Sequence, residues 1–490
     1  MKEQLVIVEK LAIDMHIKSA KSSKQILKDS ERFVHEYVLP MLEKILLAYK
    51  FKETVRLDYS ELEINLDRFK IDKTNSQFYQ SELESILKKK LDQLILPQTK
   101  PNGNRKAREK TFGEILVYFL SNGLMPWFTP KGYVLEKEFR KFISKPNGNK
   151  DLVLLLANIK KLISKDSIAF KRLIYQFDDE LLMDLLTFDG GFPGESSDQK
   201  AVMNMLRAAN PKIRSLIFSL LFYKIWFEKV KKTTIILPFF EHFISLDQKE
   251  RQKLFHTLKF LARDSPVQNS FGYQNTLEIS DLELFHIIMH HPTGKIVPKE
   301  VNDRLTERKI QKKLDAENRK DEKRETPEVL FVNNGGLVLI HTFLLDFFRK
   351  INAIDQTNKI QKGNYDLAVH ALSYISSGKT GGMESDFLLE KYLCGIPINY
   401  PVDRHFQLDE TIINESDAML DAAISHWKKL KSTSANGLRE MFFWREGKLE
   451  TKNSRLTVNR LAQDILLDSI PWNISIIKFP WMKSVLFVNW

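Results

Sequence analysis

Cysteine is almost absent from this sequence, since Cys394 is the single cysteine among 490 residues. One thiol excludes an internal disulfide framework and fits a reducing compartment. The first residues, MKEQLVIVEKL, also lack the basic head and the long apolar core of a signal peptide. Both absences predict a protein that is made and folded in the cytoplasm.

Long apolar runs are missing as well. The longest, such as residues 215–223, end at charged residues well before the roughly 20 residues that a membrane span requires, so we expect no membrane span. Apolar side chains are nevertheless plentiful, because 43% of the residues are hydrophobic and 33 are phenylalanine. That content predicts a globular chain, and its length suggests about two to four domains.

Acidic residues are outnumbered by basic ones, 63 against 75, which gives a net charge of +12. Such an excess is compatible with nucleic acid, an anionic membrane or an acidic protein as partner. The basic linker of residues 97–110 lacks the aromatic side chains that single-strand binders place between their charges. Because of the net charge, a basic nucleic-acid-binding protein is nevertheless kept as the alternative function.

Hydrophobic periodicity and charge divide the chain into five parts, and we expect a mainly α, multi-domain fold. Small antiparallel sheets are expected in the N-terminal and C-terminal α+β modules, on either side of a helical middle region. The parts are an N-terminal module at 1–96, the basic linker at 97–110, the helical middle region at 111–299, a charged linker or exposed helix at 300–326, and a C-terminal module at 327–490.

Helix and strand signals refine this division in the first half of the chain. Residues 24–50 predict a helix that Pro40 kinks or splits, and alternation over residues 54–67 predicts short strands. Thr111 and Glu114 form a capping box that predicts the start of the next helix, which Gly123 should end in the left-handed conformation. Amphipathic helices then recur between residues 150 and 291 without a fixed period.

The C-terminal module changes its period along its length. Helices are expected first, followed by a hairpin at GKLETKNSRLTV, residues 447–458, and by short strands at residues 474–479 and 484–490. Because the chain ends in an apolar, aromatic strand, we expect the C-terminus to be paired into a sheet.

Three patterns suggest chemistry, and each has a structural alternative. SSGKTGG, residues 376–382, resembles the end of a phosphate-binding loop, but Ser373 replaces the first glycine and a helix precedes it, so a connector is expected. His286 and His290 have the spacing of a zinc helix without a third ligand nearby, and are expected to be partly buried histidines. Cys394 has no base or cation beside it in sequence, which favours a buried small side chain over a nucleophile.

Motifs in the last third carry a resemblance to a known family. NNGGLVLIHTFL, LCGIP, HWKKLKSTS, GLREMFFWREGKL and PWNISIIKFPWM occur in this order over residues 330–490. The series resembles the tape measure proteins of contractile injection systems, which are phage tail-like particles. Weaker similarities lie at LEINLD, residues 62–67, and at VYFLSNGLMPWF, residues 117–128, whereas Thr342 stands where the family usually has proline.

The resemblance implies a structural protein that sets the length of the inner tube during assembly. It brings no catalytic residue, cofactor or metal, so we expect no enzymatic activity. The implied partners are inner-tube and baseplate proteins, with other copies of the chain as a further candidate, and nucleic acid is not an expected partner. The chain is expected in the cytoplasm first and in the assembled particle afterwards.

Within the motifs, large tryptophans and flanking charges are expected to act as architecture. Trp427, Trp444, Trp472, Trp481 and Trp490 should fix helices to the small sheet, because each indole buries a large area. Basic residues there have Glu440, Glu446 and Asp468 as candidate ion-pair partners, either within the fold or at a partner surface. The residues selected as structural or interaction sites are Trp127, Asn334, Gly335, Trp427, Gly437, Arg439, Glu440, Trp472, Lys478 and Trp481, and Arg445 is a further candidate for pairing.

Overall fold

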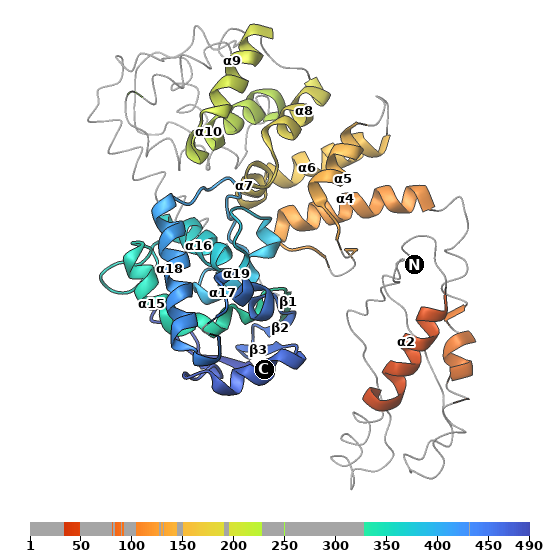
Figure 1. Cartoon of the computed structure of the whole chain (residues 1–490). Helices are drawn as coiled ribbons and strands as arrows, with labels where there is room; N and C mark the ends of the chain where they lie inside the picture. The colour runs from red at the N-terminus through yellow and green to blue at the C-terminus, as the bar shows by residue number, and fades with distance from the viewer. Residues whose placement is uncertain are drawn as a thin grey trace. The chain divides into compact units, whose positions relative to one another are not determined.

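A computed structural model gives the fold, drawn in Figure 1. It describes residues 34–49, 81, 84–89, 91–92, 104–126, 129–130, 132–144, 150–190, 196–227, 249, 328–430 and 432–490. The chain forms two compact units, and each is described by itself. The smaller unit comprises residues 1–116 and 125–139, and the larger unit comprises residues 117–124 and 140–490.

The smaller unit contains a helix over residues 34–48. A π-helical turn, Val34–Val38, leads into α2, Leu39–Ala48. Pro40 lies in the first turn of α2, where a backbone N–H has no partner within the α-helix, so its absence in proline costs no hydrogen bond. Val38 is itself in the helical conformation, so the helix continues without a break from residue 34 to residue 48 and is not split at Pro40. Leu87 and Leu91 pack with the buried side of this helix. The strands predicted at residues 54–67 lie outside the described residues.

Helix α4, Asn104–Asn122, begins earlier than the sequence indicated. The predicted start at Thr111 is wrong, because the preceding NRKAREK is rich in good helix formers and continues the helix despite its charge. The predicted end is confirmed: Gly123 has a φ of +71°, and its N–H donates to Phe119 O at 2.7 Å. Helix α5, Leu135–Ile143, follows.

The described part of the middle region is helical, as predicted. Side chains cap two of its helices: Asp166 accepts hydrogen bonds from the first N–H groups of α7, and Asn210 accepts one at the start of α10, which has Pro211 in its first turn. Helix α7 packs against α6 and α10, and Phe170 meets Phe222 edge-on at 5.7 Å. The elements are α6 (Lys150–Ile163), α7 (Ser167–Gln176), α8 (Asp179–Gly190), α9 (Ser196–Arg207), α10 (Pro211–Phe222) and a π-helical turn (Tyr223–Phe227).

The C-terminal module contains a cluster of helices above a small sheet (Figure 1). Helix α18 packs against both α15 and α16, and α16 packs against α17. The helices are α15 (His341–Lys350), α16 (Tyr365–Ser377), α17 (Leu388–Leu393), α18 (Glu410–His426) and α19 (Ala435–Leu438). Shorter 3₁₀ or π segments are η7 (Gly335–Ile340), η8 (Lys362–Asn364), η9 (Glu384–Asp386), η10 (Lys428–Leu430), η11 (Arg439–Phe443) and η12 (Ala462–Ser469).

The sheet has five strands in the order β1-β2-β3-β5-β4. The strands are β1 (Val329–Val332), β2 (Gly447–Glu450), β3 (Arg455–Val458), β4 (Ile476–Ile477) and β5 (Leu486–Asn489). The hairpin of β2 with β3 and the paired C-terminus are confirmed. The expectation of a purely antiparallel sheet is wrong, because β5 runs parallel to β3 while its other neighbour, β4, is antiparallel.

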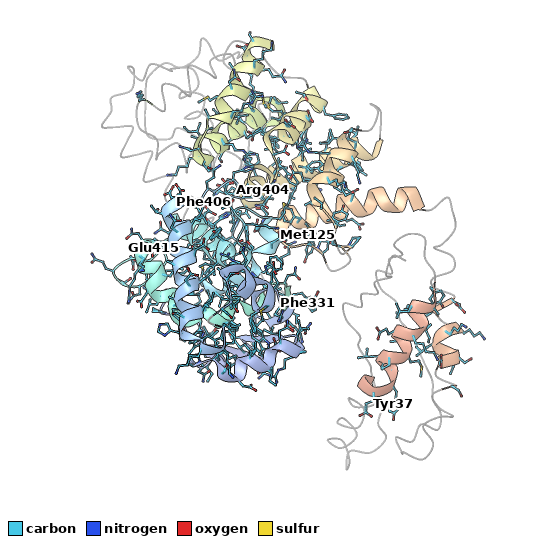
Figure 2. All side chains as sticks on the ribbon, viewed as in Figure 1. Tyr37, Met125, Phe331, Arg404, Phe406 and Glu415 are labelled. Atoms are coloured by element: carbon cyan, nitrogen blue, oxygen red, sulfur yellow. The ribbon has the colours of Figure 1, made fainter. Side chains whose placement is uncertain are left out.

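Strand β1 was not predicted. It pairs with β2 and closes the described sheet on that side. Its four residues, VLFV, alternate between the two faces, so that Leu330 and Val332 enter the core while Phe331 is 76% exposed (Figure 2). A continuous apolar run of four residues cannot be assigned to a strand by period alone.

Two sequence patterns are connectors in the structure. SSGKTGG follows α16, and Gly378 ends that helix with a φ of +69°, as the connector interpretation predicted. Cys394 is buried at the end of α17, and Gly395 follows with a φ of +65°. Burial raises the pKa of the Cys394 thiol well above its usual value, so the thiol is a packed side chain and a poor nucleophile.

Candidate functional site

Helix C-termini in the larger unit are closed by side chains that come from distant segments. The last carbonyl groups of a helix have no partner within it and need donors, preferably cationic ones. Arg439 shows the pattern: its Nε donates to Ile375 O at the end of α16 at 3.0 Å, and its Nη2 donates to Asp417 Oδ1 at 2.9 Å. Its guanidinium also lies 5.3 Å from the Tyr374 ring centre. One side chain thus joins α16, α18 and α19.

All five tryptophans of the C-terminal module donate their indole N–H to another segment of the same module. Trp427 is buried and packs on Phe442 with 5.0 Å between ring centres, and Trp481 stacks on Phe479 at 4.9 Å. The bonds run from Trp427 to Ser469 Oγ (3.0 Å), Trp444 to Ser376 O (3.0 Å), Trp472 to Leu339 O (2.7 Å), Trp481 to Leu393 O (2.8 Å) and Trp490 to Asp464 Oδ2 (2.8 Å). These side chains connect helix ends to the sheet region.

The indole of Trp472 gives a direct test of this arrangement. In Trp472→Phe the ring contact with Phe343 is kept, but Leu339 O loses its donor at the end of η7. We expect the free energy of unfolding to fall by about 1–3 kcal/mol, the cost of an unsatisfied buried group. Denaturant unfolding followed by tryptophan fluorescence measures it, and an unchanged midpoint would remove Trp472 from the structural account.

The basic residues of the motifs find other partners than the sequence suggested. Arg439 pairs with Asp417, as above, and Arg445 is buried with its Nη2 3.3 Å from Asp464 Oδ1. Lys478 donates to Met482 O at 2.6 Å. Folding thus brings carboxylates from α18 and η12 to the two arginines, whereas Lys478 bonds to a backbone carbonyl.

Glycines in two of the motifs mark close backbone approaches. Gly335 N–H donates to Arg445 O at 2.8 Å, and Gly437 N–H donates to the capping Ser434 Oγ at 3.1 Å. Gly336, which the sequence did not single out, is packed more tightly, because an added Cβ would overlap Phe442 O. Glu440 is exposed, and Trp127 lies outside the described residues.

Asn334 holds a buried carboxyl group. Its Nδ2 donates to Glu390 Oε1 at 2.6 Å, while Glu390 Oε2 has no hydrogen-bond partner among the described groups. Burial raises the pKa of Glu390 to about 8, with Asp386 adding to the effect. Glu390 is thus mostly protonated at neutral pH, and the contact joins α17 to the turn after β1.

This pKa predicts how stability depends on pH. Because the folded pKa of Glu390 lies above its unfolded value, the folded chain binds the proton more tightly, and the free energy of unfolding should fall as pH rises from about 4.5 to about 8. Glu390→Gln keeps the neutral shape and should lose that part of the pH dependence. Comparing unfolding of both proteins from pH 5 to 8 tests this, and a constant difference between them would contradict it.

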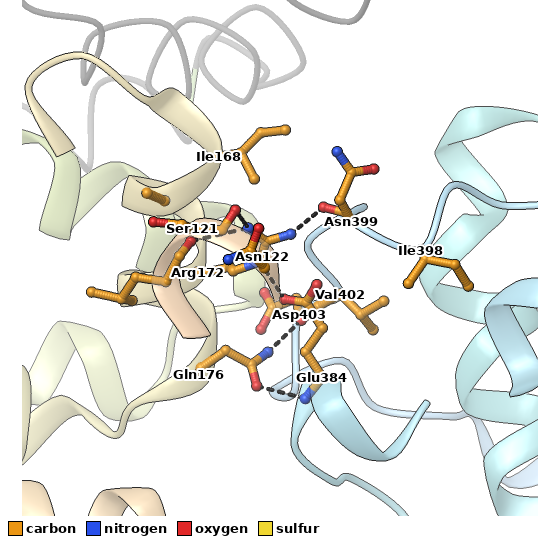
Figure 3. Close-up of polar contacts among 12 residues, drawn as sticks. Ser121, Asn122, Ile168, Arg172, Gln176, Glu384, Ile398, Asn399, Val402 and Asp403 are labelled. Atoms are coloured by element: carbon orange, nitrogen blue, oxygen red, sulfur yellow. Dashed lines mark hydrogen bonds and ion pairs between the residues drawn. The ribbon is translucent and has the colours of Figure 1, made fainter. Parts of the chain in front are cut away.

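The most buried polar cluster joins α7 to the C-terminal module, and we call it the ionic junction (Figure 3). Its centre is Arg172, which is fully buried. Arg172 Nε donates to Glu384 Oε2 at 3.0 Å, Nη1 donates to Leu120 O at 3.0 Å and to Ser121 O at 2.8 Å, and Nη2 donates to Asn399 O. One guanidinium therefore closes the end of α4 and pairs with η9.

Three more buried side chains complete the ionic junction. Gln176, one turn beyond Arg172, accepts from Glu384 N at 2.8 Å and donates to Val402 O at 2.6 Å. Lys391 Nζ donates to Glu384 Oε1 at 2.8 Å and to Ile398 O at 2.9 Å. Burial lowers the pKa of Lys391 to about 8, although Glu384 opposes the shift. Glu384 thus receives two cations and is the charge that holds the cluster together.

Gly123 makes room for this cluster. An added Cβ would overlap Glu384 Oε1 and would come within 2.9 Å of Arg172 Nε, and the φ of +71° disfavours any other residue. The glycine of VYFLSNGLMPWF therefore has two physical reasons: it ends α4, and it lets the ion pair approach the backbone.

A second group of contacts closes the end of α7. Arg404, labelled in Figure 2, donates to Gln176 O at 2.6 Å, and Arg214 from α10 donates to Phe177 O at 2.7 Å. His405 Nε2 lies 3.2 Å from the same Phe177 oxygen. Burial lowers the pKa of His405 to about 3, with Arg214 and Arg404 as further causes. His405 is hence neutral at pH 7, and its Nε2–H donates.

Sequence reasoning missed the ionic junction because its members are about 210 residues apart and stand in unremarkable helical patterns. The one available signal was a charged residue at an apolar position: Arg172 lies between Ala169, Phe170, Leu173 and Ile174, which are all buried.

His286 and His290 lie outside the described residues, so their interpretation stays a prediction. No described helix is both long and apolar enough to cross a bilayer.

Arginine and tryptophan side chains thus close helix ends in the larger unit, and a fully buried ion cluster joins α7 to the C-terminal module. A family model of contractile injection system tape measure proteins matches residues 6–490, and the chain belongs to that family. No curated protein and no solved structure matches it.

Proposed function

We propose that the chain is a tape measure-type assembly protein that sets the length of the inner tube of a contractile injection particle. The observation that carries the proposal is the family match over residues 6–490, which includes both the motif-rich C-terminal module and the regions before it. In this proposal the chain has no catalytic role and binds tube or baseplate subunits.

Physical dimensions limit how such a protein can act. A compact chain of 490 residues has a radius of gyration of about 23 Å, and the C-terminal module alone about 15 Å. Residues 1–327 drawn out as one helix would reach about 490 Å. We therefore propose that the C-terminal module stays folded at the baseplate end, where its tied helix ends keep its shape, and that the preceding chain reports length or initiates polymerisation.

Changing the spacing tests this proposal. A deletion of residues 255–320, and a duplication of the same residues, leave the ionic junction and the C-terminal module intact. Tube lengths measured by electron microscopy should shorten in the first strain and lengthen in the second if the chain is a ruler, and assembly should fail if it is an initiator. Particles of normal number and length in both strains would refute both the ruler and the initiator role.

Charge distribution bears on the nucleic-acid alternative. Residues 328–490 contain 18 basic and 18 acidic residues, so the net charge of +12 belongs to residues 1–327. A neutral module is poorly suited to contact phosphates, whose binding depends on an excess of cations. Nucleic-acid binding by residues 1–327 stays a prediction, and a salt-dependent gel shift with generic DNA or RNA measures it.

A further inference from the structure

The two sides of the ionic junction have largely separate apolar cores. The core of the C-terminal module is built from residues 330–488, and Leu124 is the only described residue before position 330 that belongs to it. On the other side, α7 packs against α6 and α10, and the Phe222 ring contacts both Phe170 and Trp226. What connects α7 to the module is mainly polar.

The polar connection is dense and fully buried. Arg172, Gln176, Glu384 and Lys391 are each 0% exposed, and Arg404 and His405 add contacts to the end of α7. Charges removed from water are costly, and their mutual attraction roughly compensates that cost without adding much net stability. An interface of this kind fixes one geometry, but it contributes less to association than apolar packing of the same area does.

Such a cluster favours two states over intermediate ones. If Glu384 alone withdrew, Arg172 and Lys391 would stay buried as two cations without a carboxylate, which is the expensive case. If the whole interface opened, water would solvate every charge at once, and Leu124 is the one described residue before position 330 that would leave the core of the C-terminal module. The side chains that connect the two sides are charged or polar, so water can hydrate them after separation.

We propose that the ionic junction is a latch, at which α7 with its neighbouring helices and the C-terminal module separate as two folded bodies. The inference does not depend on the proposed function. Separation would let a folded chain lengthen without unfolding either core. Sub-global opening of this kind occurs at interfaces with few apolar contacts.

Hydrogen exchange of the full chain, read by mass spectrometry, tests the latch. Glu384 N–H is a direct reporter, because it donates across the junction to Gln176 Oε1. The peptide covering residues 380–387, which carries this N–H, should open with a constant at least tenfold larger than that of residues 446–458 in the sheet. Residues 166–178 should keep their protection, because α7 stays a folded helix after separation. Equal protection of residues 380–387 and 446–458 would mean one cooperative body and would overturn the proposal.

Two buried arginines provide matched variants. Arg172→Gln should raise exchange of residues 380–387 at least tenfold, and residues 446–458 should still be at least tenfold better protected than residues 380–387. Arg439→Gln, which removes a helix-capping arginine inside the C-terminal module, should leave residues 166–178 unchanged. If residues 380–387 and 446–458 became equally protected in Arg172→Gln, separate bodies would be contradicted. Gln176→Met should show the same pattern as Arg172→Gln with a smaller factor.

Discussion

Gly336→Ala should destabilise the larger unit by at least about 3 kcal/mol, at the upper end of what overpacking costs. The added Cβ would overlap Phe442 O and lie within 2.8 Å of Phe443 Cα, and both are backbone atoms that cannot rotate away. The strain would separate η7 from η11, which pack against each other at the centre of the module. Six of the seven tryptophans lie in the larger unit, so fluorescence-monitored unfolding reports the loss.

Gly363→Ala is the matched control for that variant. No atom lies within 4 Å of a Cβ at Gly363, which is exposed. We expect stability to stay unchanged or to rise by up to about 1 kcal/mol, because alanine restricts the unfolded chain. If the two glycine variants had equal stability, the close approach at Gly336 would not be a determinant of the fold.

Glu384→Ala should cost about 3–5 kcal/mol, because it leaves two buried cations, Arg172 and Lys391, without their carboxylate. The loss should exceed that of any exposed ion pair. Glu415→Ala, which removes an exposed partner of Lys350, should change stability by less than about 1 kcal/mol. A Glu384 variant as stable as the Glu415 variant would show that the ionic junction contributes nothing to the folded state.

Local patterns predicted much of the fold. Capping and periodicity identified the end of α4 at Gly123, the turn at Gly378 and the hairpin of β2 with β3, because each depends on a few neighbouring residues. Strand β1 and the parallel pairing of β5 could not be found in this way. Both depend on pairing partners more than 30 residues away, and sequence periodicity does not identify such partners.

The candidate site was less accessible to sequence reasoning. Trp427, Trp472 and Trp481 were selected as anchors for their size, but their acceptors, such as Ser469 and Leu339, are fixed only by the tertiary fold. For the same reason, Arg439 could be recognised as a paired cation while its partner could not. The motif residues described here contact the interior of the module, and their role toward other subunits stays a proposal.

The most direct test of the central claim is the length distribution of particles from a strain that lacks this chain. Electron microscopy should find no particles of normal length there. A plasmid copy with Gly363→Ala should restore them, and a copy with Gly336→Val, whose module cannot close, should not. Particles of normal length and number in the strain without the chain would contradict the claim that this folded chain governs assembly.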